Sequence, residues 1–238
     1  MSGHSKWSTI KHKKAALDAK RGKIFTKIIK EISVAARTGG GDPASNPRLR
    51  FLLEKARSVN MPQDNMVRAI KKGTGELAGQ QYEAHTYEGY GPAGMAVIVE
   101  VLTDNKNKAV AELRHVFSRD GGNVGETGSV NWMFERSGVI HVTGAGLTED
   151  LLLDQLLEYP VKDIEQEDGT FIVTTEPHAC DKVKQALLDA HYTVKEAELE
   201  WVPKTMIELT GDNESKAIQF LQKLEELDDV QNVYANIS

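Results

Sequence analysis

An α+β fold is predicted for this 238-residue chain by three features of its sequence. The first third carries apolar side chains at helical spacing and contains no strand-like run. The remainder alternates short β-branched runs with helical patterns. Charge divides at the same place, because residues 1–75 hold seventeen Lys and Arg against five Asp and Glu, whereas residues 76–238 hold twelve against thirty. We therefore predict an N-terminal helical bundle followed by two α/β domains.

Capping residues delimit the predicted helices of the first part. A glycine run at 39–41 ends the first helix, and Asn46 followed by Pro47 is typical of an N-cap with proline at the first helical position. Pro62 begins a further helix that Gly73 ends. The inward faces of the first two helices are predicted to consist of Ile24, Phe25, Ile28, Ile29, Ile32 and Ala36, and of Leu49, Leu52, Leu53 and Ala56.

The second part contains enough strands for two sheets. A strand, a helix and a strand are expected at 95–103, 108–119 and 129–134. The order β-α-β-β-α-β follows at 139–143, 148–159, 161–167, 170–175, 177–191 and 194–202, which is the ferredoxin-like plan. A last strand, helix and strand at 205–210, 213–227 and 230–237 cannot close a sheet alone, so we pair them with the earlier unit.

These patterns predict three domains, the third inserted into the second. Residues 1–78 form the basic helical domain, residues 79–136 with 204–238 form a split α/β domain, and residues 137–203 form the inserted one. Both α/β domains are of ferredoxin-like type in this prediction.

Cations of the first helix share one face opposite the isoleucines, because they are spaced by three, four, three and seven residues. We call this set the basic ridge; it consists of Lys20, Lys23, Lys27, Lys30 and Arg37. Lys6, Lys11, Lys13, Lys14 and Arg21 lie nearby in the sequence. A solvated helix face usually mixes both charge signs, whereas this region is almost entirely cationic. The pattern therefore favours contact with nucleic-acid phosphates.

Trp7 lies among these cations and has two interpretations. It could stack on an unpaired base, but a tryptophan near a terminus more often packs its chain segment onto a core, and we favour packing. His12 could add charge or a base contact, although a surface imidazole is the commoner explanation.

Evidence for catalysis or for a bound cofactor is poor in this sequence. The histidines are scattered without metal-ligand spacing. Cys180, near His178 at a helix start, is better explained as a core residue than as an activated thiol. The glycine-rich segment 121–128 lacks the Lys-Ser/Thr ending of a phosphate loop, which favours a turn or a protein contact. We expect no enzyme, no metal, no cofactor and no small-molecule substrate.

Composition also indicates the compartment. No apolar run approaches the length that spans a membrane, and residues 2–14 are polar and basic where a secretory signal needs an apolar stretch. Cys180 is the single cysteine, which excludes an internal disulfide. We expect a cytoplasmic protein with no membrane partner.

Several ordered motifs resemble the YebC/PmpR family. They are Gly3-His4-Ser5-Lys6-Trp7, Asp18-Ala19-Lys20-Arg21-Gly22-Lys23-Ile24-Phe25, Gly39-Gly40-Gly41-Asp42-Pro43, Asn46-Pro47-Arg48-Leu49-Arg50 and Ala69-Ile70-Lys71-Lys72-Gly73, with further blocks up to Val130. The resemblance implies three domains and no cofactor. It also implies binding by Lys6, Lys11, Lys13, Lys14, Lys20, Arg21, Lys23 and Lys27.

Two functions are consistent with these motifs. The resemblance implies a transcriptional regulator that binds DNA, but it also extends to a mitochondrial translational activator of cytochrome oxidase and to bacterial factors linked to ribosomes stalled on proline-rich sequences. Lysines that contact phosphates position a protein without reading bases, which suits ribosomal RNA as well as DNA. The expected partner is therefore nucleic acid, either DNA or ribosomal RNA on the ribosome.

Overall fold

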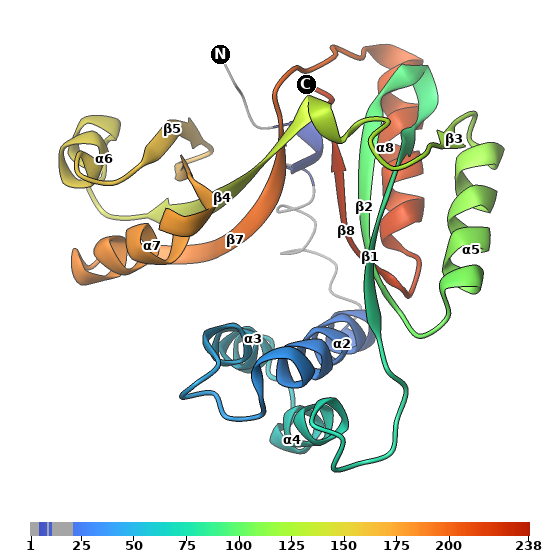
Figure 1. The fold of residues 1–238 in the computed structure, drawn as a ribbon. Helices are drawn as coiled ribbons and strands as arrows, with labels where there is room; N and C mark the ends of the chain where they lie inside the picture. Colours follow the sequence, from blue (N-terminus) through green and yellow to red (C-terminus); the bar gives the residue numbers. More distant parts are fainter. Residues whose placement is uncertain (1–4, 9, 11–20) are drawn as a thin grey trace. The chain divides into compact units, whose positions relative to one another are not determined.

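The computed structural model describes residues 5–8, 10 and 21–238 (Figure 1). The described part of the chain divides into two compact units. The larger unit contains Leu209–Ala235 and the described residues from Trp7 to Val130, so it joins the helical region to one sheet. The smaller unit contains Asn131–Glu208 and Asn236–Ser238, together with Ser5 and Lys6. The predicted boundaries at residues 78, 136 and 203 stay a prediction.

Three helices follow the predicted order in the larger unit: α2 (Arg21–Gly39), α3 (Pro47–Ser58) and α4 (Gln63–Gly73). The predicted cap of α3 is confirmed, because the Asn46 side chain accepts a hydrogen bond from the amide of Leu49 at 3.0 Å. The core between the helices includes Ile28, Ile32, Ala35, Leu49, Leu52, Leu53, Ala56, Met61, Met66 and Ala69. The helical faces read from the sequence therefore pack against one another.

Helix α4 ends in close contact with α2. The hydroxyl of Ser33 donates to the carbonyl of Ala69 at 2.9 Å. At Gly73, an added Cβ atom would lie 2.3 Å from the carbonyl oxygen of Ser33 and 2.8 Å from the Cβ of Ala36. Glycine is required at position 73 because the two helix backbones leave no room for a side chain.

We expect Gly73→Ala to lower the free energy of unfolding of the larger unit by about 1–3 kcal/mol, because the helices must separate to admit the methyl group. Urea unfolding followed by circular dichroism measures this. Gly22→Ala in α2 is the matched control, since nothing lies within 4 Å of a Cβ at that position. It should leave stability unchanged or raise it slightly, as alanine favours helices. Equal effects of the two substitutions would contradict the packing argument.

A four-stranded antiparallel sheet in the order β3-β1-β2-β8 completes the larger unit. Its strands are β1 (Glu83–Tyr90), β2 (Ala96–Thr103), β3 (Asn123–Val124) and β8 (Val230–Ala235), and its helices are α5 (Lys106–Arg119) and α8 (Gly211–Glu225). Phe117 of α5 and Phe220 of α8 meet edge to face with ring centroids 4.9 Å apart. A Cβ atom at Gly89 would meet the ring of Phe117, and one at Gly91 would meet the ring of Phe220. Positions 89 and 91 face the same side of the chain, so both helices cover the same face of the sheet (Figure 1).

Two predicted strands are wrong. Residues 129–134 do not form a strand of this sheet, because the segment is a bend and a 3₁₀ turn at Asn131–Met133, and the pairing strand is instead the short β3. The predicted strand at 205–210 is reduced to one bridge between Ile207 and Ile237. Both segments contain β-branched residues, but they lead into or out of the smaller unit and have no long neighbour with which to pair.

The smaller unit shows the element order predicted for the inserted segment. Its elements are β4 (Phe134–Thr143), α6 (Glu149–Leu156), β5 (Val161–Glu167), β6 (Thr170–Thr175), α7 (Cys180–Asp189) and β7 (Thr193–Pro203). The strands form an antiparallel sheet in the order β5-β6-β4-β7. Side chains from α6 and α7, including Leu152, Val183 and Leu187, pack with Ile140 and Val173 of the sheet in one core.

The second sheet is inserted in the sequence between strands of the first. All of its strands lie between β3 and β8, and β8 returns to pair with β2, with Val99 opposite Val233. The ends of the insertion meet, since Phe134 pairs with Pro203. No helix in the described residues is both long and apolar enough to cross a membrane.

Candidate nucleic-acid interface

Several predicted contact residues fall outside the described residues: Lys11, His12, Lys13, Lys14 and Lys20. Arg21 begins α2, but its side chain is likewise outside what the structure describes. For these residues the binding role stays a prediction. The structure does place Lys6, Trp7 and the remaining cations of the basic ridge.

Trp7 is a core residue in this structure. Its side chain is 1% exposed, and the indole Nε1 donates to the carbonyl of Val233 at 3.0 Å. Val233 lies in β8, the edge strand of the sheet, so the indole covers part of an edge that would otherwise be open. The structure therefore favours packing over base stacking for Trp7. Lys6 is half-buried, and its backbone amide donates to the carbonyl of Ile237 at 2.8 Å.

Two lysines of the basic ridge contact backbone carbonyls at the C-terminal end of α8. Lys23 Nζ donates to the carbonyl of Glu226, the C-cap of α8, at 2.7 Å. Lys27 Nζ lies 3.4 Å from the carbonyls of Glu225 and Gln231. Carbonyls at a helix C-terminus lack partners within the helix and carry partial negative charge, so ammonium groups stabilise them. Both lysines are only half-buried.

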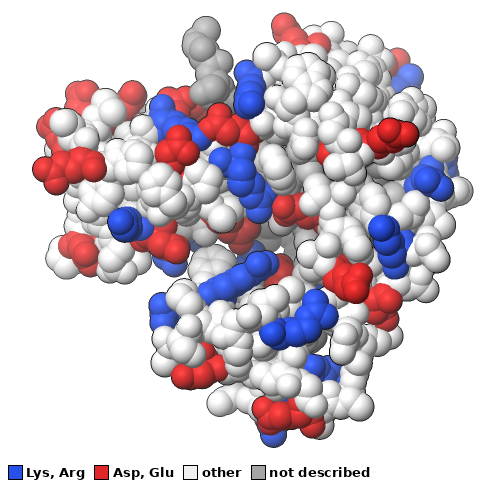
Figure 2. Space-filling view, in the orientation of Figure 1, with Lys and Arg blue, Asp and Glu red and all other residues white. Residues whose placement is uncertain are grey.

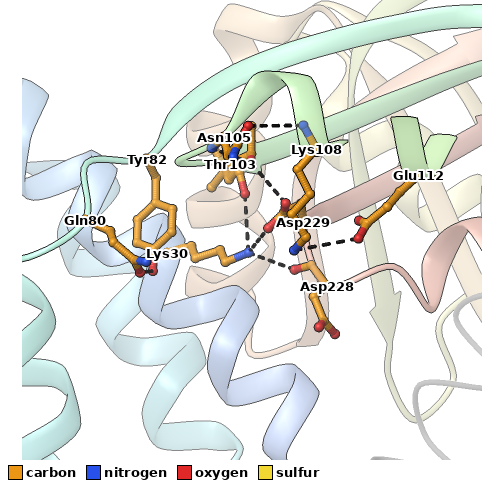
Figure 3. A network of polar contacts seen from close by, with 10 residues as sticks. Lys30, Gln80, Tyr82, Thr103, Asn105, Lys108, Glu112, Asp228 and Asp229 are labelled. Atoms are coloured by element: carbon orange, nitrogen blue, oxygen red, sulfur yellow. Dashed lines mark hydrogen bonds and ion pairs between the residues drawn. The ribbon is translucent and has the colours of Figure 1, made fainter. Parts of the chain in front are cut away.

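Lys30 is a buried member of the basic ridge, whereas its spacing predicted a phosphate contact on an open helix face; its binding role stays a prediction. Its Nζ lies 2.6 Å from Oδ1 of Asp229 and donates to the carbonyl of Asp228 at 2.8 Å. Thr103 donates to the other oxygen of Asp229 at 2.9 Å (Figure 3). Lys30 is 5% exposed and Asp229 is 6% exposed. The pair therefore joins α2 to both β2 and the turn before β8.

The electrostatics of this network follow from burial and the lysine charge. Burial by itself would raise the pKa of Asp229, but the hydrogen bonds from Lys30 and Thr103 and the charge of Lys30 outweigh it and lower the pKa. Tyr82 packs its ring 5.4 Å from Lys30 Nζ (Figure 3). Burial, with the nearby charges of Asp104 and Asp229, raises the pKa of Tyr82. Asp229 is thus an ionised partner for Lys30 at neutral pH.

The exposed cations lie elsewhere on the helices. Arg37 is exposed and donates to the carbonyl of Tyr82 at 2.6 Å. The other exposed cations of the helical region are Arg48, Arg50, Arg57, Arg68, Lys71 and Lys72. Figure 2 shows Lys and Arg side chains over α2–α4 on the face that it draws.

Helix α4 presents the most compact group of these cations. Arg68, Lys71 and Lys72 are spaced at i, i+3 and i+4, so they share one face, while Met66 and Ala69 are buried on the other. The structure gives none of the three cations an ion pair with another described residue. We call this group the α4 cluster.

A small pocket lies beside the ridge. It has a volume of about 160 Å³ and is lined by Gly22, Lys23, Thr26, Lys27, Leu227 and Asp228. Lysines from α2 and an acid from the turn after α8 thus face one small space.

The glycine-rich segment is held by a buried carboxylate. Glu88 is 5% exposed, and its two oxygens accept the amides of Gly128 at 2.9 Å and Val130 at 2.8 Å. The amide of Gly125 donates to the carbonyl of the same residue at 2.8 Å. Amides that could have bound phosphate are therefore satisfied internally, as expected for a structured turn.

Cys180 does not have the character of a nucleophile. It is 5% exposed, and burial, aided by the charge of Asp181, raises its pKa to about 11. A thiol with this pKa is almost entirely protonated near neutral pH and reacts slowly. Among the described residues there is no group of three or more His, Cys, Asp or Glu side chains placed to hold a metal ion.

Comparisons with known proteins cover nearly the whole chain. Residues 5–76 match the model of the TACO1/YebC protein N-terminal domain, and residues 82–237 match that of the TACO1/YebC second and third domain. A relative in Desulfosudis oleivorans is 53% identical over 238 residues, with 100% of this chain and 97% of the relative covered. One in Treponema denticola is 54% identical over 237 residues, with 100% and 96% covered. Both relatives are described as a "probable transcriptional regulatory protein".

A solved structure also matches. The crystal structure of a conserved hypothetical protein, Aq1575 from Aquifex aeolicus, is 44% identical and superposes with a TM-score of 0.84, covering 93% of this chain and 91% of that one. The helices α2–α4 and the two four-stranded antiparallel sheets with their helices are thus an architecture already seen in a related protein. This chain belongs to the TACO1/YebC family.

Proposed function

We propose that this chain regulates transcription by binding DNA through the exposed cations of its helical region. The observation that carries the proposal is the charge of this region: residues 21–75 hold twelve Lys and Arg against four Asp and Glu, and seven of the cations whose side chains the structure describes are exposed. Such a surface attracts polyanions and aligns them by phosphate contacts. The descriptions of the relatives supply the regulatory setting.

The contacts proposed are with the DNA backbone. Lysine and arginine on an exposed helix face meet phosphates without reading base edges, so they position the protein on the duplex. We assign this role to the α4 cluster and to its exposed neighbours Arg48, Arg50 and Arg57. Lys11, Lys13, Lys14, Lys20 and Arg21 remain proposed contacts on the strength of their sequence. No catalytic step belongs to this function.

The test is charge reversal of the α4 cluster. A variant with Arg68→Glu, Lys71→Glu and Lys72→Glu should bind duplex DNA more weakly. The slope of log affinity against log salt concentration should be shallower by about 2.7, which is about 0.9 for each phosphate that the variant no longer neutralises. Fluorescence anisotropy with a labelled duplex over a salt series measures both quantities. Circular dichroism checks that the helices remain, since all three side chains are exposed.

The matched control reverses three exposed lysines of the smaller unit: Lys182, Lys195 and Lys204. It changes the net charge by the same amount, so an equal loss of binding would mean that only overall charge matters. Binding unaffected by the α4 reversal would remove the cluster from the interface. Preference of the wild-type chain for ribosomal RNA over duplex DNA would replace DNA as the partner.

A further inference from the structure

Three lysines of the basic ridge contact oxygen acceptors of the chain that resemble the phosphate oxygens they are predicted to bind. Lys23 and Lys27 reach carbonyl oxygens at the C-terminal end of α8, and Lys30 reaches a carbonyl and the carboxylate of Asp229. All of these contacts fall within the larger unit. Carbonyl and carboxylate oxygens are anionic or partly anionic acceptors, as phosphate oxygens are. The end of α8 and the turn that follows it thus contact the ammonium groups as a nucleic-acid backbone would.

We propose that α2 carries a second DNA-binding surface, formed by Lys23, Lys27 and Lys30, and that the C-terminal end of α8 competes with DNA for it. This inference rests on the proposed function. The α4 cluster binds first, because it is exposed, and the α2 lysines join only when α2 leaves α8. The chain then has a weaker binding state with α2 covered and a tighter one with α2 released.

The three lysines are held to different degrees. Lys23 and Lys27 are half-buried, reach backbone carbonyls and border the 160 Å³ pocket, so solvent reaches their surroundings. Lys30 is buried and forms an ion pair with the equally buried carboxylate of Asp229. Breaking a buried ion pair costs far more than separating a half-exposed lysine from a carbonyl. Asp229, which Thr103 also orients, is therefore the residue that decides whether α2 stays in place.

Coupling between the two states follows from linkage. Whatever weakens the contact between α2 and α8 must raise DNA affinity, and DNA must in turn weaken that contact. Because up to three more phosphates are contacted in the released state, its salt dependence should be steeper by about 2.7 in log-log slope.

The experiment weakens the contact without changing side-chain size. The acylation rate of Lys30 by a small amine-reactive reagent is measured by mass spectrometry. In Asp229→Asn this rate should rise toward that of the exposed Lys71. The same variant should bind duplex DNA more tightly and with a steeper salt dependence. Asp212→Asn is the matched control, since it removes the same charge from an exposed site in the first turn of α8. Faster labelling without a gain in affinity over this control would overturn the proposal, and so would unchanged labelling.

A second measurement uses the wild-type chain and does not depend on how the variant folds. Saturating duplex DNA should speed hydrogen exchange at residues 226–230, the turn that α2 leaves. Slower or unchanged exchange there contradicts the competition. If neither wild type nor variant binds DNA, the proposed function itself has failed, whereas binding that Asp229→Asn does not alter rejects only this inference.

Discussion

Replacing Lys30 with methionine is expected to lower the free energy of unfolding of the larger unit by about 3–5 kcal/mol. Methionine keeps much of the side-chain volume but removes the ammonium group that lies 2.6 Å from Asp229. The carboxylate, which is 6% exposed, then keeps the hydrogen bond from the Thr103 hydroxyl and the charge of Lys108 but loses its ion-pair partner. A buried charge without its partner accounts for the loss. Urea unfolding measures the change in free energy, and hydrogen exchange at the amides of β8 shows where the stability is lost.

Removing both charges should cost far less. In the double variant with Lys30→Met and Asp229→Leu, neither charge of the pair is left, and most of the stability should return. A double variant as unstable as Lys30→Met alone would show that packing around position 30, and not the ion pair, explains the effect.

The pH dependence of stability also distinguishes loss of the ion pair from loss of packing at position 30. In the wild type the pKa of Asp229 is lowered, so its stabilising contribution is present above the unfolded value of about 3.9 and is lost as pH falls through the folded-state pKa. Without Lys30, only the hydrogen bond from Thr103 and the charge of Lys108 oppose the effect of burial, so the pKa of Asp229 rises relative to the wild type. Protonation then relieves the buried charge, and the stability difference between wild type and Lys30→Met should narrow as pH falls.

Replacing Trp7 with alanine should destabilise the same unit by about 3–5 kcal/mol. The substitution empties a site that is 1% exposed and removes the hydrogen bond to the carbonyl of Val233 in the edge strand β8. Amides of β8 should therefore exchange faster, and urea unfolding should occur at lower concentration. Trp7→Phe, which keeps an aromatic ring but has no N–H donor, should fall between the wild type and Trp7→Ala.

Trp132→Ala is the control for losing an indole. Trp132 is 61% exposed, so its removal should change stability little. If Trp7 instead stacked on a base, Trp7→Ala would leave the free protein as stable as this control and lower only nucleic-acid affinity. That result would contradict the core position of Trp7.

Local patterns predicted the helices and the inserted sheet well. Asn46 and Pro47 identify the start of α3 because side-chain capping and the fixed φ of proline act within a few residues. The alternation of strands and helices between β4 and β7 likewise depends on neighbours in sequence. The strand expected at 129–134 failed because this segment holds one β-branched residue, Val130, and because β3 takes the place beside β1.

The position of Lys30 could not be read from its spacing. Its partner lies 199 residues away, and a lysine every three or four residues is equally consistent with a solvated face. A signal was nevertheless present in the sequence. The run Ile32-Ser33-Val34-Ala35-Ala36 contains no charge, and all five residues are buried, as expected for a helix covered on every side. Such a run after Lys30 indicates that cations on the same turns also face protein.

The inserted topology has a consequence for the order in which the chain folds. Strand β8 must find β2 across a long intervening segment, since Thr103 and Asp229 are 126 residues apart, and long loops are entropically costly to close. The smaller unit brings the ends of the insertion together through the pairing of Phe134 with Pro203. Once that sheet has formed, the effective loop is roughly halved and its closure costs about 0.6 kcal/mol less. Folding of the insertion thus brings the chain ends closer together for the return of β8.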